Sequence, residues 1–259
     1  MSLYVITHKY LENFIDSKDY KYLFVGGYKE AEKNANYLYD DEGDNISNKN
    51  ANYCELTGLY WMWKNVNDEF LGLAHYRRYF THNSFSASPR YFYKVNELNS
   101  LLEKNDIIVS EKIYLSDLTL YDDYVHYHYK KDVDNLKIII NDYFPDFMDS
   151  FNIVFSKRYF NPANMFYARK DLVDEYCEWL FNVLAKYEKI TDISNYNVQQ
   201  ARIYGFIAER LLNVWIHQKQ LKKIELPCVQ TDSSMKLRFR KKLDKLLKKS
   251  IRIKAKYER

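Results

Sequence analysis

Residues 70–78 read FLGLAHYRR, a short apolar run that ends in charged and aromatic side chains. The apolar part is continuous rather than alternating, which is typical of a strand buried on both faces of a sheet. Short apolar runs that predict strands occur six times: Leu3–Thr7, Tyr22–Val25, Phe70–His75, Asp106–Ser110, Asn164–Ala168 and Lys223–Leu226. The sequence therefore predicts a central sheet made largely of buried strands.

Helical patterns separate these strands. Apolar and aromatic side chains recur at helical spacing in three segments: Asn50–Lys64, Leu172–Tyr187 and Val198–His217. Because strands alternate with helices, we expect an α/β fold whose mostly parallel central sheet is flanked by helices. The composition changes only near Thr231–Met235, which predicts one domain over residues 1–230 and a tail over residues 231–259.

The composition excludes several classes of protein. Of the 259 residues, 47% are hydrophobic and 29% are charged, which excludes a disordered or collagen-like chain. No apolar run approaches the roughly 18 residues of a membrane-spanning helix, and residues 1–6 lack the pattern of a secretion signal. Cys54, Cys177 and Cys228 lie far apart and predict no disulfide framework. We therefore expect a cytoplasmic protein.

The tail differs in charge from the rest of the chain. The formal net charge is +4, but residues 236–259 contain 12 Lys and Arg against 2 Asp and Glu, which leaves an acidic body. Phe239, Leu243 and Ile251 recur at helical spacing in this segment, so we predict a basic amphipathic helix. Such a helix is suited to an anionic membrane surface. Packing against the body and binding to nucleic acid are the alternatives.

Common catalytic and metal-binding motifs are absent from the sequence. It contains no GxxxxGK[ST], GxGxxG, HExxH or GxSxG motif. His126 and His128 alternate with tyrosines and lack a second matched pair of ligands, so we expect no zinc site. The acidic body also carries no nucleic-acid-binding motif, and we expect no nucleic-acid partner for it.

Polar side chains follow two of the expected strands. Thr7-His8-Lys9 ends the first run, and His75-Tyr76-Arg77-Arg78 ends the third. Ligands in open α/β sheets bind at the carboxyl ends of strands. Two adjacent guanidinium groups carry fixed positive charge and many N–H donors, which suits a diphosphate. The alternative is that both arginines pair with carboxylates of the acidic body.

Residues 40–47 form a polar loop that precedes a predicted helix. Asn45 or Ser47 in this loop could cap the helix, and Asp41 and Asp44 could instead accept hydrogen bonds from sugar hydroxyl groups. A divalent metal is not expected there, because all of the carboxylates lie on one short loop without a distant partner.

Two longer blocks of sequence are more specific. Residues 44–65 read DNISNKNANYCELTGLYWMWKN, and residues 72–80 read GLAHYRRYF. Four shorter blocks follow: Tyr124-x3-His128-x3-Asp132, Asn164-Met165-Phe166, YCEWLF at residues 176–181 and GFIAERL at residues 205–211. In this order the blocks resemble a bacterial family long catalogued as a domain of unknown function and found in capsular and exopolysaccharide gene clusters. The resemblance runs from the first strand to about Pro227.

The resemblance implies a glycosyltransferase with a GT-A-like nucleotide-binding fold. Characterised relatives resemble inverting galactofuranosyltransferases that use UDP-galactofuranose. Enzymes of the GT-A class usually hold the diphosphate through a metal bound to an Asp-x-Asp motif, whereas this chain has His75-Tyr76-Arg77-Arg78 at the corresponding strand end. We therefore expect a metal-independent enzyme without a cofactor, in which Arg77 or Arg78 stabilises the leaving UDP.

Candidate roles follow for individual residues. An inverting transfer needs a general base, for which Glu209 is the first candidate, with His128 and Asp123 as alternates. An ion pair with Arg210 or Arg202 is the other interpretation of Glu209. Nucleotide binding is assigned to Thr7, His8, Lys9, Asp44, Asn45, Asn50, His75, Arg77 and Arg78. The sugar pocket is assigned to Asn164, Met165 and Arg202, although ordinary packing would also explain Met165.

Together these features predict an enzyme at the inner face of the cell membrane. It would transfer a hexosyl unit, galactofuranosyl by the resemblance, from a UDP-sugar to a lipid-linked oligosaccharide. The basic tail would bring the body to a membrane-held acceptor. The alternatives are a non-catalytic nucleotide-sugar-binding component of a capsule assembly complex and a protein that binds nucleic acid through its tail.

Overall fold

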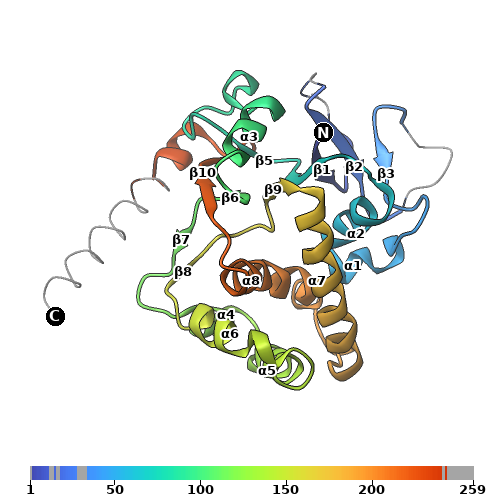
Figure 1. Ribbon diagram of the computed structural model, residues 1–259, viewed down its shortest axis with the longest axis vertical. Helices are drawn as coiled ribbons and strands as arrows, with labels where there is room; N and C mark the ends of the chain where they lie inside the picture. The colour runs from blue at the N-terminus through green and yellow to red at the C-terminus, as the bar shows by residue number, and fades with distance from the viewer. Residues whose placement is uncertain (1, 12–14, 16–17, 28–33, 241–242, 244–259) are drawn as a thin grey trace, which may run out of the picture.

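The computed structural model describes the chain except for residues 1, 12–14, 16–17, 28–33, 241–242 and 244–259. One twisted sheet forms the middle of the molecule, and helices cover it on both faces (Figure 1). The predicted α/β fold with a mostly parallel central sheet is confirmed.

The main sheet has the strand order β10-β6-β9-β4-β1-β2-β3. These strands are β1 (Ser2–Thr7), β2 (Tyr20–Phe24), β3 (Leu38–Tyr39), β4 (Phe70–His75), β6 (Ile107–Ser110), β9 (Phe166–Arg169) and β10 (Lys223–Leu226). Strand β1 pairs in parallel with β2 and β4, and β6 pairs in parallel with β10. Only β9 of this path runs antiparallel to its neighbours, β4 and β6. All six predicted strands are present, although β9 begins two residues later than predicted.

Of the strands that the structure describes, five short ones were not predicted, and β3 of the main sheet is one of them. Strand β5 (Arg78–Phe80) turns back from the end of β4, and β11 (Cys228–Gln230) pairs with it antiparallel. Strands β7 (Ile113–Tyr114) and β8 (Tyr159–Phe160) form a separate two-stranded sheet. Segments of two or three residues are too short for an apolar pattern to reveal them.

The predicted helix Asn50–Lys64 is wrong in one respect, because the structure divides it. Helix α1 (Asn50–Tyr53) stops at Cys54, whose φ is +53°, and α2 (Leu56–Asn65) begins two residues later. The side chain of Asn50 stabilises the break, since its Nδ2 donates to the carbonyl oxygen of Cys54 at 2.7 Å and to Oγ1 of Thr57 at 2.9 Å. The apolar stripe continues through the break, so periodicity could not reveal it.

The other two predicted helices are present. Helix α7 (Lys170–Ile190) contains the whole predicted segment, whereas α8 (Ile203–Gln218) begins five residues after the predicted start. A turn and the 3-10 helix η5 (Gln200–Arg202) precede α8, and the Asn197 side chain accepts a hydrogen bond from the Gln200 amide there. Four of the α-helices that the structure describes were not predicted: α3 (Val95–Leu102), α4 (Leu120–Tyr127), α5 (Lys130–Tyr143) and α6 (Met148–Phe155).

The apolar core has one part on each face of the sheet. In β1, Tyr4 and Ile6 face α2, α7 and α8, whereas Leu3 and Val5 face the side that α3 covers. All six residues of β1 are buried. Complete burial of an apolar side chain such as Leu3, Val5 or Ile6 stabilises the fold by about 1.5–3 kcal/mol. Helices α4, α5 and α6 form an outer layer that packs on α7 and α8 (Figure 1).

The first part of the basic tail contacts the body. Arg238 donates from Nε to the carbonyl oxygen of Phe85 at 3.1 Å, and the Phe239 ring lies 5.9 Å from the Phe85 ring. Most of the predicted amphipathic helix, at residues 241–242 and 244–259, lies outside the described residues. Among the helices that are described, none has both the length and the apolar character needed to cross a bilayer.

We expect Gly72→Ala to destabilise the protein by about 1–3 kcal/mol or more, because inserted core atoms force backbone shifts. A Cβ at Gly72 would lie 2.5 Å from the Tyr167 ring and 2.6 Å from the carbonyl oxygen of Phe166. Gly205→Ala is the control, since its Cβ would meet no atom closer than 3.6 Å. Urea unfolding measures both. An equal unfolding midpoint for the two variants would contradict the close packing of β4 against β9.

Candidate functional site

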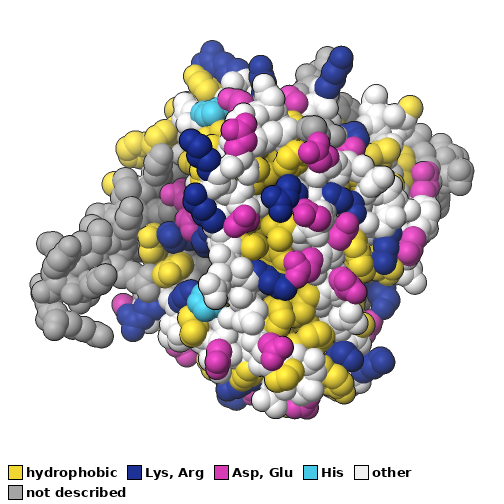
Figure 2. Space-filling model, in the orientation of Figure 1, with side chains coloured by type: hydrophobic (Ala, Val, Ile, Leu, Met, Phe, Trp, Pro, Cys, Tyr) yellow, Lys and Arg dark blue, Asp and Glu magenta, His cyan; other side chains and the backbone are white. Residues whose placement is uncertain are grey.

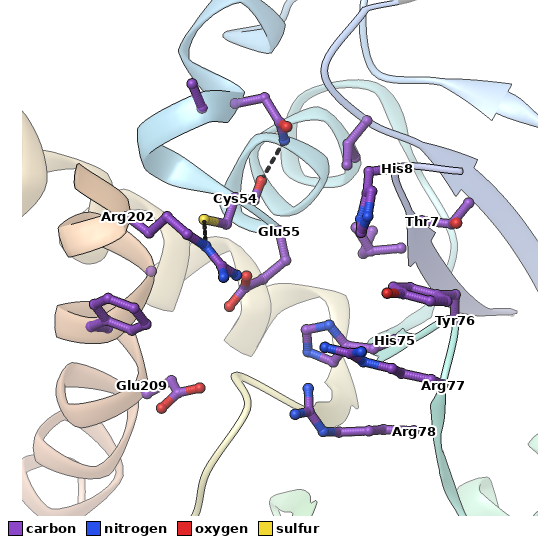
Figure 3. A pocket seen from close by; sticks show the side chains of 16 residues that line it. Thr7, His8, Cys54, Glu55, His75, Tyr76, Arg77, Arg78, Arg202 and Glu209 are labelled. Carbon is purple, nitrogen blue, oxygen red and sulfur yellow. Dashed lines mark hydrogen bonds between the residues drawn. The ribbon is translucent and has the colours of Figure 1, made fainter. Parts of the chain in front are cut away.

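A cavity of about 490 Å³ opens where β1 and β4 end. Strand ends form one wall and helices form the opposite wall (Figure 3). The strand wall carries Thr7, His8, His75, Tyr76, Arg77 and Arg78, and the helical wall carries Asn50, Cys54, Glu55, Arg202, Phe206 and Glu209. Eight of the residues assigned from the sequence therefore meet in one place: Thr7, His8, Asn50, His75, Arg77, Arg78, Arg202 and Glu209.

The two arginines of the strand wall differ in their partners. Arg77 pairs with Asp232, with 3.2 Å between Nη1 and Oδ2, and both side chains are about two-fifths exposed. Such an exposed pair contributes little, typically below about 1 kcal/mol. Arg78 is half-buried, and no hydrogen bond or ion pair of its side chain is found among the described residues. Arg78 is thus available to an anionic ligand.

Two cationic side chains lie near the Tyr76 ring on the strand wall. The Lys9 ammonium lies 5.1 Å from the centre of its ring, and the Arg77 guanidinium lies 5.3 Å from it. The His8 ring packs edge-on against the same ring at 5.3 Å. Burial and the neighbouring cations Lys9 and Arg77 lower the pKa of His8. The wall is therefore cationic without needing a charged histidine.

His75 is neutral and fixed. Its Nε2 donates to the carbonyl oxygen of Ala163 at 2.6 Å, because a carbonyl oxygen can only accept. Burial and the nearby Arg78 charge lower the pKa of His75 to about 4. His75 is therefore a hydrogen-bond donor to the backbone that leads into β9.

Two carboxylates face the strand wall from the helical side (Figure 3). Oε1 of Glu209 accepts a hydrogen bond from the Ala163 amide at 3.1 Å, and its Oε2 accepts one from Arg210 at 3.3 Å. Oε1 of Glu55 accepts a hydrogen bond from Nδ2 of Asn164 at 2.7 Å. Burial raises the pKa of both carboxyl groups above the ordinary range.

Several assigned residues do not line the cavity. Asp44 and Asn45 organise their own loop, where Asn45 accepts a hydrogen bond from the Ser47 amide and donates one to the carbonyl oxygen of Gly43. Tyr60 donates a hydrogen bond to Asp44. Lys9 lies beyond the rim, and its amide is bonded to Oγ1 of Thr7.

The two alternate base candidates also lie outside the cavity. Asp123 forms an ion pair with Arg210 at 3.4 Å, and both side chains are largely buried. Nδ1 of His128 donates to Oε1 of Gln200 at 2.9 Å. Both residues therefore connect α4 to the elements around α8. Asn164 and Met165 are buried behind the wall, with only 1% of each exposed.

Three cavity residues with polar or ionisable side chains were not assigned from the sequence: Cys54, Glu55 and Tyr76. Glu55 lies within the first specific block, and it is the single acidic residue between Ile46 and Trp63. An isolated carboxylate in an aromatic helical stretch was the signal that could have identified it.

The residues of the cavity do not fit a divalent metal ion held between protein and diphosphate. Guanidinium groups, which repel a cation, lie at the end of β4, where a bound metal ion would have to meet the diphosphate. Over the described part of the chain, no three His, Cys, Asp or Glu side chains are grouped as metal ligands.

The comparisons with known proteins bear on the family and the fold of the chain. A solved structure described as the apo form of the WbbM bifunctional glycosyltransferase is 30% identical to this chain, with a TM-score of 0.77 over 90% of it. The match covers 45% of that chain, so our protein spans less than half of it. No curated protein sequence matches significantly. The family described as a domain of unknown function, DUF4422, matches residues 2–220, and the chain belongs to this family.

Proposed function

We propose that the protein is a glycosyltransferase that moves a hexosyl unit from a UDP-sugar to a lipid-linked oligosaccharide. The observation that carries this proposal is the half-buried Arg78, which has no partner among the described residues and faces two carboxylates across the cavity. The likeness to a bifunctional glycosyltransferase supports the same activity, as does the resemblance of the sequence blocks to a family found in polysaccharide gene clusters.

The strand wall is suited to the diphosphate of the donor. Arg78 donates its free N–H groups to the phosphate oxygens, and Arg77 reaches them by exchanging its exposed pair with Asp232. Negative charge grows on the leaving UDP as the bond to the sugar breaks, and fixed guanidinium charge stabilises it there. In this proposal the arginines take the place of a divalent cation, so the transfer is metal-independent.

The helical wall is suited to the acceptor. A hydroxyl group that attacks the sugar must lose its proton, and a carboxylate within reach is the ordinary base for that step. Of the three candidates assigned from the sequence, only Glu209 faces the cavity, and Glu55 joins it there. A single displacement between the two walls inverts the configuration at the sugar, which is the stereochemistry that we propose.

We propose galactofuranose as the donor sugar, because the blocks in residues 44–65 and 72–80 resemble enzymes that use UDP-galactofuranose. We further propose that the basic tail holds the enzyme at the anionic inner face of the membrane, where a lipid-linked acceptor is anchored. On the face shown in Figure 2, acidic and basic side chains are interspersed over the body. The excess of basic residues is in the tail sequence.

The donor site predicts that UDP raises the melting temperature equally with EDTA and with Mn²⁺. A ligand at 100 times its Kd stabilises the folded state by about 2.7 kcal/mol. Arg78→Gln should weaken UDP binding about tenfold or more, since hydrogen bonds to charged groups contribute about 1.5–3 kcal/mol. Arg90→Gln is the control, because Arg90 is exposed and contacts Tyr91 rather than the cavity.

A separate transfer assay with UDP-galactofuranose and an oligosaccharide acceptor measures UDP release. Binding of the donor without transfer would favour the non-catalytic alternative. UDP affinity that is unchanged in Arg78→Gln, or that depends on Mn²⁺, would contradict the proposed donor site.

Removal of residues 241–259 should reduce binding to vesicles that contain phosphatidylglycerol, because each Lys or Arg near an anionic surface contributes roughly 1 kcal/mol. This variant keeps the contacts of Arg238 and Phe239 with Phe85. Co-sedimentation measures the bound fraction, and phosphatidylcholine vesicles are the control. Equal sedimentation of the full chain and the shortened chain would reject a membrane role for the tail.

A further inference from the structure

The break between α1 and α2 places one carboxylate in the cavity. Cys54 adopts a φ of +53°, which ends α1 and makes Glu55 the residue that precedes the first turn of α2. The side chain of Glu55 caps no amide of α2. It points instead into the cavity (Figure 3).

Asn164 fixes the orientation of this carboxylate. Its Nδ2 donates to Oε1 of Glu55 at 2.7 Å and to the carbonyl oxygen of Gly205 at 3.3 Å. Two acceptors on one amide nitrogen determine which way the amide points. Asn164 is 1% exposed, and its Oδ1 is buried without a hydrogen-bond partner. Asn164 also has a φ of +50°, in the left-handed region. A buried acceptor without a partner and a strained backbone occur together at functional sites rather than in ordinary cores.

The second oxygen of Glu55 remains open to a ligand. No other described residue donates a hydrogen bond to Oε2 of Glu55. The absence of a side chain at Gly205 leaves room beside it, since a Cβ there would lie 3.8 Å from that oxygen. Asn164 therefore holds Oε1 of Glu55, and no other described residue competes with an acceptor hydroxyl for Oε2.

Glu209 is in a different position. Both of its oxygens already accept hydrogen bonds, one from the Ala163 amide and one from Arg210. Ala163 precedes Asn164, so the bond from Glu209 holds the backbone that presents Asn164 to Glu55. A hydroxyl group that reaches Glu209 would share an oxygen that already has a protein donor, whereas no other described residue donates to Oε2 of Glu55.

The charges around Glu55 are consistent with a base. Arg202 from η5 and Arg78 from β5 face it and lower the pKa of its carboxyl group, whereas Glu209 on α8 is a like charge. Cys54 adjoins it and donates no hydrogen bond to it. Burial outweighs the two cations and raises the pKa of Glu55. A carboxylate with a raised pKa accepts a proton more readily at neutral pH.

We propose that Glu55 is the general base of the transfer and that Glu209 and Asn164 are positioning residues. This assignment rests on the proposed glycosyltransferase function. In the step, Oε2 of Glu55 takes the proton of the acceptor hydroxyl, and the acceptor oxygen forms a bond to the anomeric carbon. The bond from that carbon to the diphosphate oxygen breaks, its electron pair leaves with UDP, and the proton passes from Glu55 to solvent after release.

The test compares Glu55→Gln, Glu209→Gln and Glu178→Gln, with UDP-galactofuranose and the oligosaccharide acceptor. Glu55→Gln keeps the shape of the side chain and the bond from Asn164, so we expect UDP affinity close to that of the unmodified protein. Its turnover should fall by roughly 10²–10⁴-fold. The decrease of kcat toward acidic pH, which is the acidic limb of the pH profile and reports protonation of the base, should disappear. Glu55→Asp should restore part of the turnover and the limb.

The two control variants separate a base from a positioning residue. Glu209→Gln can still accept the Ala163 bond, so its acidic limb should remain while turnover falls less than in Glu55→Gln. Glu178 is exposed on α7, away from the cavity, and its variant should behave as the unmodified protein does.

Each of the remaining outcomes contradicts either the assignment of Glu55 or the proposed function. Turnover near the normal rate in Glu55→Gln, or loss of the acidic limb only in Glu209→Gln, rejects the assignment and leaves the transferase function intact. A glycosyl adduct on Glu55 in mass spectra would make it a nucleophile and reject its role as a base. If the unmodified protein binds the donor but transfers nothing to any acceptor, the proposed function fails and the assignment fails with it.

Discussion

The backbone of Ala163 is hydrogen-bonded to both walls of the cavity, and the shape of the cavity depends on this constraint. His75 at the end of β4 donates to its carbonyl oxygen, and Glu209 on α8 accepts from its amide. Ala163 and Asn164 both have positive φ values, +74° and +50°, which cost about 1–3 kcal/mol each for residues other than glycine. The two hydrogen bonds offset that cost. The two bonds also join the sheet to α8, because His75 lies on the strand wall and Glu209 lies on the helical wall.

The cavity keeps opposite charges apart, although they face each other. Arg78 acts to lower the pKa of Glu55, yet no ion pair within 4.0 Å joins the two side chains among the described residues. A direct ion pair between Arg78 and Glu55 would occupy both groups, and the site could then bind neither a phosphate nor a hydroxyl group. The hydrogen bond from Asn164 holds Glu55 on its own wall, and the turn from β4 to β5 holds Arg78 on the other.

Local sequence predicted the strand wall better than the helical wall. The segment at residues 70–78 contains both a buried strand and the polar residues at its end, so one pattern revealed β4, His75 and Arg78 together. Glu55 and Asn164 meet across 109 residues of sequence, and their contact depends on the left-handed turns at Cys54 and Asn164. Apolar periodicity continues through Cys54, so it predicted an unbroken helix there. Spacing alone therefore could not bring this pair together.

The strand wall also depends on chain beyond the region that matches the family. The match ends at residue 220, but β11 (Cys228–Gln230) pairs with β5, the strand on which Arg78 stands. The Thr231 amide donates to the carbonyl oxygen of Arg77 at 2.9 Å, and Asp232 pairs with the Arg77 side chain. The residues after β11 thus restrain one arginine while leaving the other open. This difference explains how two adjacent guanidinium groups at one strand end can have separate roles, because Arg78 is presented to a ligand and Arg77 must first exchange its partner.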